Sequence, residues 1–153
     1  MYRRRGLTAA IVGVISVALV VGAVGGALAA DNTVSAKLSG KAEEPGPGDD
    51  DGSGEAVLSL KKKKKKISFN ISFEGIQDPV MGHIHKGTRK VAGPIKVTLF
   101  DEPAGVTSPE SGTVKAKKKL IKKIKNDPNG WYVNLHNSDF PDGAIRGQLK
   151  PGG

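Results

Sequence analysis

Residues 67–73 alternate apolar and polar side chains without a break, and this pattern restricts the fold more than any other stretch of the chain. Ile67, Phe69, Ile71 and Phe73 fall at every second position, with small polar residues between them. A period of two is typical of a β-strand that buries one face and exposes the other. Similar patterns, separated by Gly- and Pro-rich turns, predict strands at residues 32–40, 55–60, 95–100, 131–136 and 144–149, and one more around His83.

Short strands at such intervals favour an all-β fold, an antiparallel Greek-key sandwich or barrel of about 7–8 strands. The exception is the segment near 117–125, where Leu120, Ile121 and Ile124 have helical spacing. We therefore expect one short helical turn, lying across one end of the barrel.

The chain carries a formal net charge of +9, but many of its lysines are concentrated in Lys61–Lys66 and in residues 115–125. Six consecutive like charges cannot pack together, so the first run should be a solvated connection between two strands. Neither run is interleaved with aromatic residues, so we expect no nucleic-acid partner. An anionic polymer of the cell envelope or an extracellular protein stays open as the partner.

The first 30 residues have the layout of a secretory signal peptide. The triplet Arg3–Arg5 precedes an uncharged run from Leu7 to Leu28, and the small residues Ala27 and Ala29 mark a cleavage site. We expect a secreted or cell-envelope protein, with residues 31–153 as its single β domain. Because the run is long enough to cross a bilayer, an uncleaved segment is the one membrane contact left open. The absence of cysteine excludes disulfides and thiolate metal sites.

The three histidines of the chain are its strongest candidates for a functional site. His83 and His85 are separated by Ile84, so in a strand both imidazoles project from one face. His136 lies in a later predicted strand, on its polar side. If the two strands are neighbours, about 5 Å apart, the three rings surround one point. Three neutral imidazoles with an open position suit copper or zinc.

The same pattern has a purely structural interpretation. The histidines could be hydrogen-bonded residues that pin the barrel, with Asn134 and Gln148 satisfying neighbouring backbone groups. Arg146, on the closing strand, could contact an anion or form a salt bridge with Asp139 or Asp142. The sequence has no nucleophile motif, and its carboxylates lie in predicted loops. We therefore expect a binding or structural module rather than an enzyme, and both interpretations of the histidines stay open.

Several short pieces, taken in order, resemble the chordin (CHRD) domain. They are Leu38-Ser39-Gly40 followed by Glu43-Glu44-Pro45, then GHIHKG at 82–87, YVNLH at 132–136 and GAIRGQL at 143–149, so that the likeness spans about residues 33–150. The lysine runs depart from the pattern of that family. The resemblance implies an exported β domain that acts as an extracellular binding or structural module, as such domains do in animal chordins.

A more distant likeness is to Cu/Zn superoxide dismutase, a Greek-key barrel whose copper is held by an H-x-H strand and a later histidine. His83, His85 and His136 lie in similar local motifs, and Arg146 follows them as the anion-guiding arginine of that enzyme does. The chain lacks the bridging histidine, the zinc ligands and the disulfide of that enzyme. As the alternative function, this likeness implies a copper-binding or superoxide dismutase-like protein.

Overall fold

The computed structural model describes residues 32–152, so the predicted signal peptide at 1–30 lies outside the described residues. The strands are β1 (Thr33–Ser39), β2 (Ser53–Lys61), β3 (Lys66–Glu74), β4 (Met81–Lys86), β5 (Ile95–Asp101), β6 (Glu110–Lys115), β7 (Trp131–His136), β8 (Ile145–Gln148) and β9 (Lys150–Pro151). They are joined by one α-helix, α1 (Lys118–Asn126), and two 3-10 helices, η2 (Gly40–Ala42) and η3 (Pro128–Gly130). Within the described part, no helix is long and apolar enough to cross a membrane.

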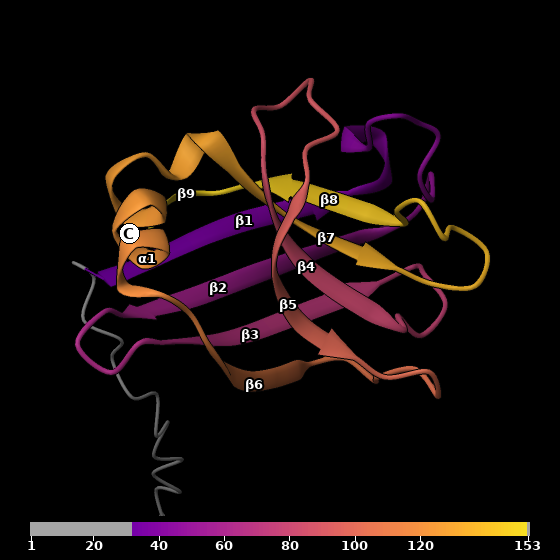
Figure 1. The fold of residues 1–153 in the computed structure, drawn as a ribbon. Coiled ribbons are helices and arrows are strands. Elements are labelled where there is room, and N and C mark those ends of the chain that lie inside the picture. The colour runs from indigo at the N-terminus through magenta and orange to yellow at the C-terminus, as the bar shows by residue number, and fades with distance from the viewer. Residues whose placement is uncertain (1–31, 153) are drawn as a thin grey trace, which may run out of the picture.

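The strands form one antiparallel sheet in the order β5-β4-β7-β8-β1-β2-β3-β6, with β9 added beside β1 (Figure 1). The two ends of this order, β5 and β6, contact each other, so the sheet curls into a nearly closed barrel. The predicted all-β antiparallel fold is confirmed. The contact between β5 and β6 brings the two edge strands together, whereas an open sheet would leave them as separate exposed edges.

The barrel interior is built from the alternating positions that the sequence predicts. In the β2–β3 pair, Leu58 lies opposite Phe69 and Leu60 lies opposite Ile67, and all four side chains are buried. Full burial of such a side chain contributes about 1.5–3 kcal/mol to folding. Phe73, at the end of the same alternation, packs against the core but is only partly buried.

Helix α1 lies across one end of the barrel, as predicted from its spacing. Ile121 and Ile124 are buried and Leu120 is partly buried, whereas the lysines of the helix are exposed. The Lys61–Lys66 run forms the β2–β3 connection: Lys61 and Lys66 pair with each other, and the four residues between them make an exposed turn. The predicted solvated hairpin is therefore confirmed.

The alternation of residues 95–100 predicts that Ile95 faces the interior together with Val97 and Leu99, and for Ile95 this prediction is wrong. Its side chain is 50% exposed. The β4–β5 register shifts between Ile84 and His85, so that Ile95 pairs with His85 and shares its outward side. A shift of one residue moves side chains to the opposite face of a strand, and sequence alternation alone does not locate such a shift.

Candidate metal centre

The three histidines lie on two neighbouring strands, as the spacing of the sequence predicts. Strand β4 pairs with β7 in a register that sets His83 opposite Asn134 and His85 opposite Tyr132, and His136 opposite Met81. One possible ligand nitrogen from each ring lies within 4.8 Å of the others. The ring centroids of His83 and His136 are 5.0 Å apart, and those of His83 and His85 are 5.6 Å apart.

This outer face of the sheet is buried, because loops cover it. All six residues of β7 are buried, so the strand has an apolar side in the core and a polar side beneath the loops. The three histidines are 6–7% exposed. Gln148 Nε2 lies 2.8 Å from the carbonyl of Gly87, and the backbone N–H of Gly93 donates to the Tyr132 hydroxyl at 3.0 Å. The loop at residues 87–94 is thereby fastened over the histidines.

Two of the rings are fixed in one tautomer by backbone carbonyls. His85 Nδ1 lies 2.8 Å from the Gly93 oxygen, and His136 Nδ1 lies 3.0 Å from the Pro141 oxygen. Because a carbonyl oxygen only accepts, both Nδ1 atoms carry the proton and both Nε2 atoms keep a free lone pair. These two Nε2 atoms and Nδ1 of His83 are buried and have no hydrogen-bond partner within residues 32–152.

The environment keeps these imidazoles neutral. Burial lowers the pKa of His83 to about 4, and the neighbouring His136 and His85 act in the same direction while Asp101 opposes them. Burial also lowers the pKa of His85 and of His136, although their hydrogen bonds to backbone carbonyls act against it. A neutral imidazole is the form that binds a metal ion, so at pH 7 no proton has to leave before binding.

Tyr132 links the histidines to Arg146. Its ring stacks on His85, with centroids 4.7 Å apart and planes inclined by 13°, and the Arg146 guanidinium carbon lies 3.5 Å from the Tyr132 centroid. Arg146 Nη2 donates to the carbonyls of Thr88, Arg89 and Val91 at 2.9–3.3 Å. These carbonyls take the place of the expected salt bridge to Asp139 or Asp142. Arg146 Nη1 is buried and has no hydrogen-bond partner among residues 32–152, and the contact of Arg146 with an anion stays a prediction.

Glu43 forms a second buried polar group beside this layer. It is 5% exposed, and Asn134 Nδ2 donates to its Oε2 at 3.3 Å. Burial raises the pKa of Glu43 to about 7, against the opposing effects of Arg146 and of the hydrogen bond from Asn134. Asn134 therefore contacts a carboxyl group rather than the backbone group that we expected, whereas Gln148 does contact backbone carbonyls.

The nitrogens are nearly close enough to share one ion. Bonds of about 2.0–2.1 Å allow two ligating nitrogens to be at most about 4.2 Å apart. The ligand nitrogens of the three histidines lie within 4.8 Å of one another, which exceeds this distance by less than one ångström. Small rotations of the rings would close that gap. The arrangement therefore provides three neutral nitrogen ligands, two of them oriented by backbone carbonyls in the manner usual for metal-binding histidines.

Sequence reasoning named the three histidines and Arg146 as candidates, and it did not name Tyr132 and Glu43, which contact this group of residues. Tyr132 alternates with Asn134 and His136, so its position on the histidine face could have been inferred from the strand pattern. Glu43 lies in the loop that follows β1 and is brought to the site only by the fold. The one sequence signal for it is its place in the Glu43-Glu44-Pro45 motif.

Comparison with known proteins agrees with the motifs. The family model described as the CHRD domain matches residues 34–149, which include the strands of the barrel as far as β8 and all three histidines. No curated protein and no solved structure shows a significant match to the chain. Because the matched range covers most of the sequence, the chain belongs to the CHRD-domain family.

Proposed function

We propose that this protein is an exported CHRD-domain module that binds one copper or zinc ion through His83, His85 and His136. The observation that carries the proposal is the set of three buried imidazole nitrogens that have no hydrogen-bond partner within the described residues. Export is supported by the sequence of residues 1–30 and by the extracellular character of the family. The mass of the protein recovered from the culture medium tests export and cleavage directly.

The structural interpretation of the histidines accounts for only part of this geometry. Hydrogen bonds to Gly93 and Pro141 explain Nδ1 of His85 and of His136, but they leave one nitrogen of each ring unsatisfied. A buried polar atom without a partner destabilises the fold by about 1–3 kcal/mol. A single ion would satisfy all three nitrogens at once, which favours a binding site over a set of structural pins.

Copper is the ion that this ligand set favours. Among divalent first-row metals, affinity for nitrogen ligands rises to Cu²⁺ and falls again at Zn²⁺. Three protein ligands leave a fourth position for water or another small ligand. Both ions fit the donor set, so their relative affinity is a result for experiment.

The proposal is tested by titrating the purified, metal-free protein with Cu²⁺ and Zn²⁺ in a calorimeter. We expect one ion per chain, and electron paramagnetic resonance of the Cu²⁺ form should show coupling to nitrogen ligands. His85→Ala should weaken binding by more than about 100-fold, because even loss of an outer-shell partner lowers affinity by about 10–100-fold. The matched control is Lys86→Gln, which alters the next residue, whose side chain is exposed.

Circular dichroism of both variants, recorded before the titration, separates loss of a ligand from loss of the fold. If the wild-type protein binds neither ion more tightly than micromolar, the metal proposal is refuted. If His85→Ala is folded and binds as tightly as the wild type, the site lies elsewhere on the protein.

The alternative function is that of a copper-dependent, superoxide dismutase-like protein. It is favoured by the H-x-H strand beside a third histidine and by Arg146 Nη1, which is buried next to this layer and has no hydrogen-bond partner in the described part of the chain. Superoxide consumption by the copper-loaded protein, compared with that of copper-loaded Arg146→Lys, distinguishes the two functions. A binding module has no activity above that of free copper in either form.

A further inference from the structure

One end of the barrel carries most of the lysines of the domain. The β2–β3 turn, the segment that follows β6 and helix α1 meet at this end (Figure 1). The side chains concerned are exposed or partly exposed: Lys61, Lys62, Lys63, Lys64, Lys65, Lys66, Lys115, Lys117, Lys118, Lys119, Lys122, Lys123 and Lys125. We call this surface the lysine end.

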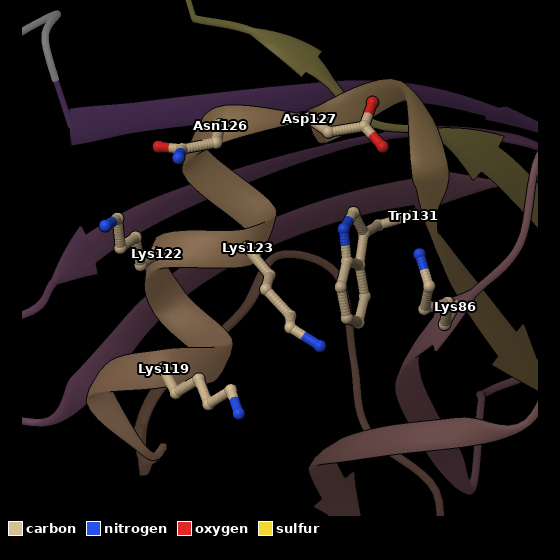
Figure 2. Close-up of a pocket in the computed structure, with 7 residues that line it drawn as sticks. All are labelled: Lys86, Lys119, Lys122, Lys123, Asn126, Asp127 and Trp131. Atoms are coloured by element: carbon tan, nitrogen blue, oxygen red, sulfur yellow. The ribbon is translucent and has the colours of Figure 1, made fainter.

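The lysine end is hollowed by grooves that are themselves lined with lysine. In the groove shown in Figure 2, Lys123 of α1 extends toward the indole of Trp131, and Lys86 lies on the other side of that ring. Lys119 and Lys122 of the same helix also line the groove. Lys86 Nζ lies 4.9 Å from the centroid of that ring. A second groove is lined by residues 61–64 together with Asn32, the first described residue.

These charges are not neutralised within the described part of the chain. The ion pair found among residues 32–152 joins Lys90 to Glu44, away from this end. Lys61 donates to the Ser68 hydroxyl and Lys125 to the Asn32 side chain, so both of these partners are neutral. Asp127 is the acidic residue in the lining of the Figure 2 groove, and no ion pair to it is found among residues 32–152. The lysines therefore keep an excess of positive charge, which attracts anions from outside the protein.

The opposite end of the domain carries acidic loops. The loop between β1 and β2 contains Asp49, Asp50 and Asp51, and the loop after β7 contains Asp139 and Asp142. Because β2 runs from the first of these loops to the lysine turn, the two charge signs occupy opposite ends of the barrel. The charge distribution therefore orients the domain toward an anionic surface.

The entry point of the chain indicates which surface this is. Asn32 lines a groove of the lysine end and accepts a hydrogen bond from Lys125. The uncharged run that ends at Leu28 comes only four peptide steps earlier, a reach of at most about 14 Å. If that run is not cleaved and occupies a bilayer, it brings the lysine end within reach of the lipid headgroups, and the charge of those headgroups decides whether the lysine end docks on them.

We infer that the lysine end docks on an anionic phospholipid surface, with the N-terminal segment as its tether. Basic clusters that adjoin a membrane segment interact with acidic lipid headgroups in this way. A soluble polyanion would also suit the charge, but it would make no use of the position of the N-terminal segment at this end.

The test uses the full-length chain and a single fluorescent label. Because the chain has no cysteine, Lys64→Cys at the lysine end and Asp50→Cys at the opposite end each provide one labelling site. Both positions are exposed. Each labelled protein is reconstituted with vesicles of equimolar phosphatidylglycerol and phosphatidylcholine that carry a headgroup-attached quencher. We expect quenching at position 64 to exceed that at position 50 several-fold.

The difference should fall to the smaller value that the tether alone gives at about 1 M salt, where the Debye length is about 3 Å, and in vesicles of phosphatidylcholine alone. It should also shrink when Lys119→Gln and Lys122→Gln are combined with the label at position 64. Equal quenching at the two positions in acidic vesicles overturns the inference, as does a preference of the same size in neutral vesicles. A label at position 64 that responds to long-chain polyphosphate but not to vesicles assigns the surface to a soluble polyanion instead.

Discussion

Replacing Glu43 by glutamine should change the pH dependence of folding stability. The carboxyl group is 5% exposed, its Oε1 has no partner within the described residues, and burial raises its pKa from 4.5 to about 7. Gly48 and Gly143 enclose it, since a Cβ at either position would lie 2.5 Å from a Glu43 side-chain atom. Glutamine has nearly the same shape and is uncharged at every pH, so Glu43→Gln removes the titration and keeps the packing.

The sign and the magnitude follow from the two pKa values. Between pH 4.5 and about 7 the folded protein holds a proton on Glu43 that the unfolded chain has lost, so the stability of the wild type falls as the pH rises. A gap of this width corresponds to about 3 kcal/mol. We therefore expect the free energy of unfolding of Glu43→Gln, minus that of the wild type, to increase by about 3 kcal/mol across this range and to stay constant above it.

Urea unfolding at a series of pH values, with a chelator present and the fluorescence of Trp131 as the signal, measures this difference. Trp131 is the only tryptophan of the chain and is 2% exposed, so its emission should respond to unfolding. Taking the difference between two proteins cancels the titration of the histidines that they share. The control is Glu44→Gln, which removes a surface ion pair with Lys90 worth at most about 1 kcal/mol. A difference that does not change with pH, or that decreases as the pH rises, refutes the reasoning.

Three further predictions concern stability. In the metal-free Glu43→Gln background, lowering the pH from 6.5 to about 4 should destabilise the fold by about 3 kcal/mol, because burial lowers the pKa of His83 in the folded protein. A urea midpoint that does not change with pH would contradict this. Lys65→Gly should stabilise the β2–β3 turn by up to about 1 kcal/mol, because Lys65 has a positive φ of 53°, and a lower urea midpoint would show that this conformation is not strained. Gly147→Ala should destabilise the protein by about 1–3 kcal/mol, because the added Cβ would collide with the backbone carbonyl of Lys37. An unchanged thermal midpoint would show that the barrel can adjust there.

Much of the fold could be predicted from the sequence, because the strands and the helix follow repeats of apolar residues that are local in the sequence. Ile67, Phe69 and Ile71 occupy the core at the positions that their alternation indicates, and Ile121 and Ile124 anchor the helix that their spacing indicates. Local patterns of this kind determine which face of an element is buried, provided that no bulge shifts the register. The shift in β4–β5 is such a case, and it is why the prediction for Ile95 failed.

The site could be predicted only in part, because most of its contacts join residues that are distant in the sequence. The H-x-H spacing places His83 and His85 on one face, but a pairing of strands had to be assumed to bring in His136. The contact between Glu43 and Asn134 spans 91 positions, and no local pattern marks it. The loop at 87–94 joins two of the predicted strands, but its position over the outer face depends on hydrogen bonds from Tyr132, Arg146 and Gln148.

The hydrogen bonds that hold this loop have a consequence for sequence divergence. Arg146, His85 and Gln148 contact main-chain oxygens of residues 87–93, and every amino acid carries such an oxygen. Apart from Gly93, where a Cβ would collide with the Lys86 carbonyl, the side chains of the loop are therefore free to change during evolution without opening the site, as long as the backbone keeps its path. The constraint falls instead on His85, Arg146 and Gln148, which hold the loop. Relatives should therefore vary in the side chains of the loop and keep these three residues.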